Sequence, residues 1–177
     1  MSSRSTPPLP GAKAPDLSVS TTDGGSWELA KQTPENFTLL IFYRGLHCPI
    51  CKSILQELNK NVGKFEDKGT QVFVVSMDSQ DRASRSKEEW DIDKLAVGYG
   101  LTEDQARDWG LFFSESIKEE EPQMFSEPAV FIIKPDQTLF AAYVQSAPFA
   151  RPRIEDLLGA VDFVLENDYP PRGTLDR

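Results

Sequence analysis

Cysteine and histidine are scarce in this chain of 177 residues, which contains only Cys48, Cys51 and His47. A self-contained tetrahedral zinc site needs four ligands, so these three side chains are too few to form one. The chain is also long enough to bury an ordinary hydrophobic core without disulfide bridges. We therefore expect the two cysteines to act together as a single pair.

Positive charge and long apolar runs are scarce as well. The chain has 19 Lys and Arg against 28 Asp and Glu, a formal net charge of -9, which repels phosphate backbones and anionic lipids. We therefore expect no nucleic-acid partner and no membrane partner. No segment approaches the length of a membrane span, and the Ser- and Pro-rich start, residues 1–16, lacks the apolar core of a signal peptide. We expect a cytoplasmic protein, and in that reducing compartment a lone cysteine pair is more often catalytic or redox-sensing than structural.

The pattern of apolar residues predicts one domain over residues 15–167, with a flexible arm at 1–14 and an extended tail at 168–177. Buried strands, two hairpins and helices alternate along it. The expected strands are 37–44, 71–76, 128–133 and 139–144, with a small hairpin at 17–29; the expected helices start at 48, 82, 102 and 153. Gly63 should end the first helix, and residues 114–127 should form an irregular acidic loop. Together these elements predict an α/β fold with a mixed central sheet flanked by helices.

The two cysteines form the motif Cys48-Pro49-Ile50-Cys51, directly after an apolar run and at the start of a helical pattern. Residues three apart lie on one face of a helix, close enough for a disulfide. The unpaired N–H groups of a first helical turn, where proline is tolerated, stabilise a thiolate at Cys48. Two other interpretations stay open: two inert buried thiols, or half of a metal cluster shared between two subunits. The placement favours a dithiol/disulfide redox centre.

A buried strand that runs into C-x-x-C at a helix start resembles the thioredoxin superfamily. Further segments look like its peroxiredoxin (alkyl hydroperoxide reductase/thiol-specific antioxidant) branch, namely Phe42-Tyr43 and residues 74–79, 131–136 and 148–151. The resemblance covers about Ala14 to Glu166. It implies a thioredoxin-like fold and thiol-dependent redox chemistry that needs no metal or organic cofactor.

Two positions depart from the peroxiredoxin pattern. With Phe42-Tyr43 as the anchor, Cys51 falls on the peroxidatic cysteine and Cys48 replaces the family's threonine. Pro128 stands where a peroxiredoxin has its transition-state arginine. Thioredoxins have a cysteine and a cis-proline at these two places, so the resemblance implies a peroxiredoxin body with a thioredoxin-like active site.

Three charged or polar side chains near the motif are candidates for supporting roles. Arg44 is either an active-site cation or a surface charge at the end of the strand. His47 either stabilises the Cys48 thiolate when protonated, or shuttles a proton, or is exposed without a role. Glu127 is either a proton relay or a surface glutamate of the acidic loop. Arg151 matches the family's arginine after the hairpin, which does not face the peroxide, so we expect it to matter less.

Three functions fit these residues. In the first, a thiol-disulfide oxidoreductase, the more acidic and more exposed Cys48 attacks a disulfide of a protein or small-molecule partner and Cys51 resolves the mixed disulfide. In the second, a thiol peroxidase, the same pair reduces a hydroperoxide. The peroxidase's threonine and arginine are replaced here, so we expect slow reaction with peroxide unless Arg44 or Arg151 substitutes for them. The third function is a non-enzymatic redox sensor or cluster-binding module; the oligomeric state, a homodimer included, is left open.

Overall fold

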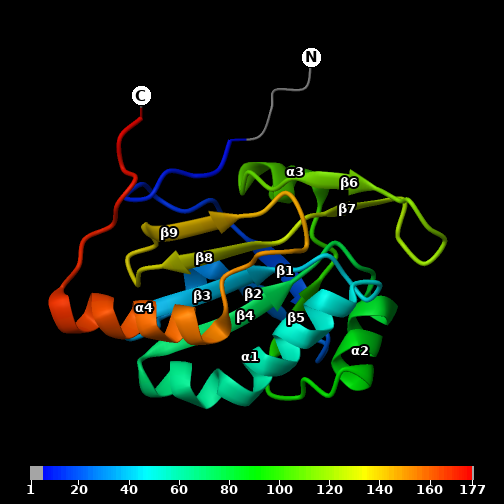
Figure 1. Cartoon of the computed structure of the whole chain (residues 1–177), viewed down its shortest axis with the longest axis horizontal. Coiled ribbons are helices and arrows are strands. Elements are labelled where there is room, and N and C mark those ends of the chain that lie inside the picture. Colours follow the sequence, from blue (N-terminus) through cyan, green and yellow to red (C-terminus); the bar gives the residue numbers. More distant parts are fainter. Residues whose placement is uncertain (1–5, 177) are drawn as a thin grey trace.

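A seven-stranded mixed sheet forms the centre of the protein in the computed structural model, which describes residues 6–176. The strand order is β2-β1-β5-β4-β3-β8-β9. Helices α1, α2 and α4 cover one face, and α3 with the separate β6–β7 hairpin lies on the other side (Figure 1). The strands are β1 Ser18–Thr21, β2 Ser26–Glu28, β3 Phe37–Phe42, β4 Thr70–Val75, β5 Ala96–Tyr99, β6 Phe113–Glu115, β7 Met124–Ser126, β8 Ala129–Ile133 and β9 Leu139–Val144. The helices are α1 Pro49–Asp67, α2 Gln80–Glu89, α3 Glu103–Asp108 and α4 Ile154–Asn167, with a short 3-10 turn at Leu29–Lys31. The predicted α/β fold is confirmed.

Strand β3 is the middle of the core because both of its faces are covered. All six of its residues are buried, as its continuous apolar sequence predicts. Leu39 and Ile41 pack into the cluster beneath α1 and α4, whereas Leu40 and Phe42 pack into the cluster on the α3 side. The strand runs parallel to β4 and antiparallel to β8. Its carboxyl end is therefore held on both sides where the chain turns toward Cys48.

Helix α1 is longer than the sequence predicts. Its buried face is the predicted one, with Cys51, Leu55, Leu58 and Val62 facing the core. Gly63 does not end it, because a Cβ at this exposed position would contact nothing and the hydrogen-bond ladder continues to Asp67. The chain reverses instead at Gly69, which has the positive φ of +63° that favours glycine.

The acidic segment between α3 and β8 is partly ordered, contrary to the prediction of an irregular loop over residues 114–127. Strands β6 and β7 pair antiparallel from Phe113 opposite Ser126 to Glu115 opposite Met124. Phe125, between Met124 and Ser126, is buried. This hairpin brings one apolar side chain over the loop that carries the cysteines.

The ends of the described chain lie close together. On the arm, the N–H of Gly11 donates to the carbonyl of Leu139, and a Cβ added to Gly11 would lie 3.1 Å from Cγ2 of Thr174 in the tail. The described parts of the arm and of the tail lie on the same side of the molecule (Figure 1). Residues 1–5 of the predicted arm lie outside the described residues, and the division into arm, domain and tail stays a prediction. No helix within residues 6–176 combines the length and apolar composition that crossing a bilayer requires.

Candidate redox site

The loop between β3 and α1 is fixed by a carboxylate in the segment that follows the neighbouring strand β4. The N–H of Leu46 donates to Oδ2 of Asp78 at 2.8 Å. Gly45 has φ +136°, and a Cβ there would lie 2.8 Å from Oδ1 of the same aspartate. Only glycine lets the backbone approach Asp78 this closely, so the path to Cys48 depends on both residues.

Cys48 is the N-cap of α1, and Pro49 is its first helical residue, as the motif predicts. The Sγ of Cys48 accepts the N–H of Cys51 at 3.2 Å. Both thiols are free, and both cysteines are buried, Cys48 being 1% and Cys51 0% exposed. The prediction that Cys48 is exposed is therefore wrong, because the surrounding loops cover the start of the helix.

The pKa values of the two thiols are shifted in opposite directions. Hydrogen bonds from the Cys51 thiol and the Cys51 N–H hold the pKa of Cys48 well below its usual range, and Arg44 and Arg151 act in the same direction. Burial raises the pKa of Cys51, and the neighbouring Cys48 sulfur raises it further. This order is the one that the sequence predicts, with Cys48 as the more acidic thiol.

Arg44 is an interior cation of the site and not a surface charge. Its Nε lies 2.9 Å from Oε2 of Glu127, and its guanidinium carbon lies 4.8 Å from the ring centre of Phe125. The same guanidinium is one of the groups that lower the pKa of Cys48. Arg44 thus lies between Cys48 and the residues around the β6–β7 hairpin.

Glu127 is 3% exposed, so the alternative of a surface glutamate is wrong. Besides the ion pair with Arg44, it accepts a hydrogen bond from the hydroxyl of Ser114 at 2.7 Å. A role as a proton relay stays a prediction. The contacts of Glu127 are those of a group that orients Arg44.

His47 cannot stabilise the thiolate as a cation near neutral pH. Burial, assisted by the charge of Arg44, lowers the pKa of His47 to about 4. Within residues 6–176, its two buried ring nitrogens have no hydrogen-bond partner, and the ring packs 4.5 Å from that of Phe125. The proposal of a protonated His47 is wrong because the β6–β7 hairpin covers the ring, and the alternative of a solvent-exposed histidine is wrong for the same reason.

Pro128 does not form the cis-proline of a thioredoxin, because no peptide bond in residues 6–176 is cis. Its carbonyl accepts the N–H of Gln145 at 2.9 Å, continuing the pairing between β8 and β9. Pro128 also lines a cavity of only about 10 Å³, together with Arg151 and side chains of β8 and α4.

Arg151 lies closer to the cysteines than the sequence predicts. Its Nη2 lies 3.1 Å from the Sγ of Cys51 and 3.8 Å from the Sγ of Cys48. Its Nε donates to the carbonyl of Pro148 at 2.8 Å, which fixes the guanidinium from behind. The site therefore holds two arginines beside two sulfurs.

Comparison with known proteins identifies the family. Residues 10–142 match the family described as AhpC/TSA. The chain belongs to the AhpC/TSA family. No curated protein matches it.

Solved structures agree in fold with this AhpC/TSA chain. The peroxiredoxin-like protein from Aquifex aeolicus is 20% identical, with a TM-score of 0.74 over 91% of this chain and 90% of that one. A point mutant of peroxiredoxin 6 from Arenicola marina is 16% identical, with a TM-score of 0.76 over 93% of this chain and 80% of that one. AhpC from Mycobacterium tuberculosis is 13% identical, with a TM-score of 0.73 over 92% of this chain and 96% of that one. At these identities the likeness shows the fold alone.

Membership of the AhpC/TSA family makes the protein a thiol-dependent redox enzyme, as the resemblance implied. Its arrangement of charges is that of a dithiol centre: an acidic thiol at a helix N-terminus, a buried partner thiol and two flanking cations. Within the part of the chain that the structure describes, no three His, Cys, Asp or Glu side chains converge as metal ligands. A thiol with a lowered pKa, such as Cys48, is the group in this site best suited to act as a nucleophile.

Proposed function

We propose that this AhpC/TSA enzyme reduces small hydroperoxides, with Cys48 as the attacking thiolate and Cys51 as the resolving thiol. The observation that carries the proposal is the position of Arg151, within 3.1 Å of one sulfur and 3.8 Å of the other. The expectation of slow reaction with peroxide depended on the replacement of the family's threonine and arginine, unless Arg44 or Arg151 substitutes for them. Arg151 and Arg44 supply two cations beside the sulfurs.

The reaction proceeds in two steps. The Cys48 thiolate attacks the terminal oxygen of ROOH, the O–O bond breaks, and the departing RO⁻ takes a proton to leave as ROH, with Cys48 as a sulfenic acid. The sulfur of Cys51 then attacks that of Cys48, forming the disulfide, and its proton leaves with the hydroxyl group as water. In sum, the dithiol and ROOH give the disulfide, ROH and H₂O. Preorganised cations stabilise the negative charge that develops on both oxygens in the first step.

The burial of the sulfurs limits the size of the substrate. Both cysteines are almost fully covered, and neither lines the cavity of about 10 Å³ beside Arg151 and Pro128. A substrate of the size of hydrogen peroxide needs only a small opening to reach a covered sulfur. A bulky hydroperoxide would have to displace more of the side chains that cover it.

Thiol-disulfide exchange is the second candidate, and the acidic N-cap thiol of a C-x-x-C pair favours it. A protein disulfide would have to reach a sulfur that is covered, and the Pro128 carbonyl is already bonded to Gln145 and so is not free to pair with an extended substrate. Exchange still completes the peroxidase cycle, because an external thiol donor, a protein or a small molecule, must reduce the Cys48–Cys51 disulfide. A reducing compartment provides such donors, so we retain the cytoplasm as the proposed location.

Stopped-flow oxidation of the reduced enzyme tests the proposal. Hydrogen peroxide, the bulky cumene hydroperoxide and a small disulfide are compared under the same conditions. We expect a hydrogen peroxide rate constant several orders of magnitude above that of a free thiolate, with cumene hydroperoxide slower. A hydrogen peroxide rate equal to that of a free thiolate, beside fast exchange with the disulfide, would establish the second candidate instead.

A further inference from the structure

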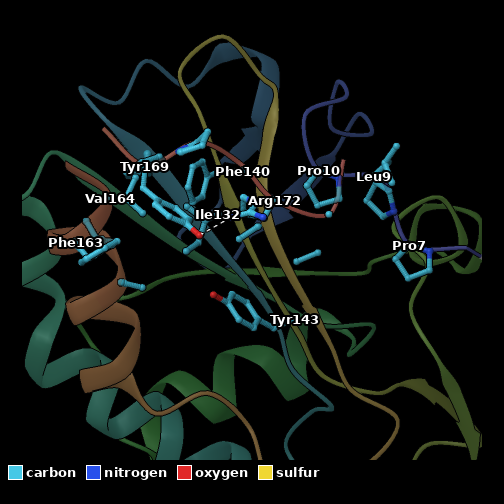
Figure 2. Close-up of a pocket in the computed structure, with 18 residues that line it drawn as sticks. Pro7, Leu9, Pro10, Ile132, Phe140, Tyr143, Phe163, Val164, Tyr169 and Arg172 are labelled. Carbon is cyan, nitrogen blue, oxygen red and sulfur yellow. Dashed lines mark hydrogen bonds between the residues drawn. The ribbon is translucent and has the colours of Figure 1, made fainter. Parts of the chain in front are cut away.

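A second hollow lies away from the cysteine pair. It is a groove of about 590 Å³ between α4, β9, the proline-rich arm and the tail, and Figure 2 shows the side chains that line it. Phe37, at the start of β3, lines the groove, whereas Cys48 follows the end of that strand, which is about 17 Å long at 3.3 Å per residue. Neither the cysteines nor Arg44 nor Arg151 contributes to its walls. The groove is therefore a feature separate from the redox site.

The walls of the groove are apolar and aromatic. Its floor and sides come from strands and helix, and the arm closes the end opposite α4 with a row of prolines and a leucine: Pro7, Pro8, Leu9 and Pro10 (Figure 2). Phe163 is 53% exposed and Tyr169 is 38% exposed here, so large rings face an open space instead of a packed core. Volumes between about 300 and 1,000 Å³ with mostly apolar linings are those of small-molecule sites.

The charge of the groove differs from that of the rest of the chain. The chain carries 28 acidic residues and a net charge of -9, yet none of the side chains that line the groove is acidic. Arg172, an exposed residue of the tail at the edge of the groove, is the one charged side chain among them, and within residues 6–176 it forms no ion pair with a carboxylate. One unpaired cation at the edge of an apolar groove is complementary to a single anionic group.

The polar groups at the groove are arranged as donors. Nη1 of Arg172 donates to the hydroxyl oxygen of Tyr169 at 3.0 Å, the contact drawn as a dashed line in Figure 2. The hydroxyl proton of Tyr169 is then directed away from the guanidinium and can be donated to an acceptor. A carboxylate placed beside this pair would accept hydrogen bonds from both groups, and charge-assisted bonds of this kind are among the strongest.

We infer that the groove binds an apolar monocarboxylate, such as a medium-chain fatty acid, with its carboxylate on Arg172 and Tyr169 and its chain along the apolar walls. A second negative charge would find no partner on those walls, which excludes dicarboxylates. The inference does not depend on the peroxidase proposal, because the groove shares no residue with the cysteine site.

Titration calorimetry with decanoate, below its micelle concentration, tests the inference on the reduced full-length enzyme. We expect binding of one decanoate per chain, and no comparable binding of decylamine, which has the same chain and the opposite charge. Arg172→Ala should weaken binding by about 10-fold to 100-fold, the usual value of a hydrogen bond to a charged group, and Arg172→Lys should recover part of it. Arg85→Ala is the matched control, because Arg85 is an exposed arginine of α2 that pairs with Glu89 and should leave binding unchanged.

A second variant tests the apolar half of the site. Ala160, on the α4 wall of the groove, is replaced in Ala160→Trp, which should fill the space and abolish binding while circular dichroism and thermal melting show a folded protein. Equal binding of decanoate and decylamine, or decanoate binding that neither Arg172→Ala nor Ala160→Trp changes, would overturn the inference. A stable dimer that Ala160→Trp dissociates, with no binding of decanoate, would overturn it too and assign the groove to a second copy of the chain.

Discussion

Replacing Arg151 by alanine should slow the reaction of Cys48 with hydrogen peroxide about 100-fold to 1000-fold, the usual cost of losing one preorganised charge-stabilising donor. The guanidinium lies 3.1 Å and 3.8 Å from the two sulfurs, and its bond to the Pro148 carbonyl keeps it there before substrate arrives. It therefore stabilises developing charge without reorganising. The variant should also raise the pKa of Cys48, since Arg151 is one of the groups that lower it.

Two measurements separate these effects. The thiolate absorbance in the ultraviolet, titrated against pH, gives the pKa of Cys48, and stopped-flow kinetics above that pKa give the rate of the fully ionised thiol. Arg151→Lys keeps the charge but not the fork of donors, so its rate should fall between those of the wild type and Arg151→Ala. Arg153→Ala is the matched control, because Arg153 is exposed and pairs with Glu155. A pH-independent rate in Arg151→Ala equal to that of the wild type would refute the assignment of Arg151 as a transition-state cation.

Three further predictions concern the cysteines, the half-buried histidine and the loop. Cys48→Ser should abolish turnover. Cys51→Ser should consume one equivalent of peroxide and stop at a sulfenic acid or at a mixed disulfide with the donor, and mass spectrometry identifies which of the two forms. Multiple turnovers by Cys51→Ser would exclude the resolving step. His47 binds a proton near pH 6.5 in the unfolded chain but only near pH 4 in the folded one, so protons favour unfolding in this window. The free energy of unfolding should decrease as the pH falls between these values, and His47→Gln should reduce the decrease; an unchanged pH dependence in the variant would contradict the low pKa. Gly45→Ala should destabilise the protein by more than about 1 kcal/mol in urea titrations, because a Cβ at φ +136° meets Asp78, whereas Gly63→Ala, on the exposed side of α1, should stabilise it by about 0.5 to 1 kcal/mol. Equal effects of the two glycine substitutions would argue against the role of the loop.

The parts of the site that were predictable are those encoded within a few residues. The N-cap position of Cys48, Pro49 at the first helical position and the buried face of α1 all follow from local spacing, and so does the acidity of Cys48. The continuous apolar sequence of β3 likewise predicts a strand covered on both faces.

The errors concern contacts between residues far apart in the sequence. Arg151 is 100 residues from Cys51, and nothing near either residue indicates that they meet. The burial of His47 and Glu127 depends on the β6–β7 hairpin, whose strands have three residues each in an acidic segment and so leave almost no alternating pattern. The only signal in the sequence was an arginine, Arg151, in the short loop before the last helix. The resemblance to the peroxiredoxin family led to the expectation that this arginine matters less.

The two arginines also have a thermodynamic consequence for the disulfide. They stabilise a negative charge that exists only in the dithiol form, because oxidation converts the Cys48 thiolate into an uncharged sulfur and leaves Arg151 beside a neutral bond. Whatever lowers the free energy of the reduced state makes the disulfide a stronger oxidant. The oxidised enzyme should thus pass its oxidising equivalents readily to a thiol donor, and equilibration with glutathione should show a less oxidising disulfide in Arg151→Ala. The cations that help to break the O–O bond would then also drive the return of the enzyme to its reduced form.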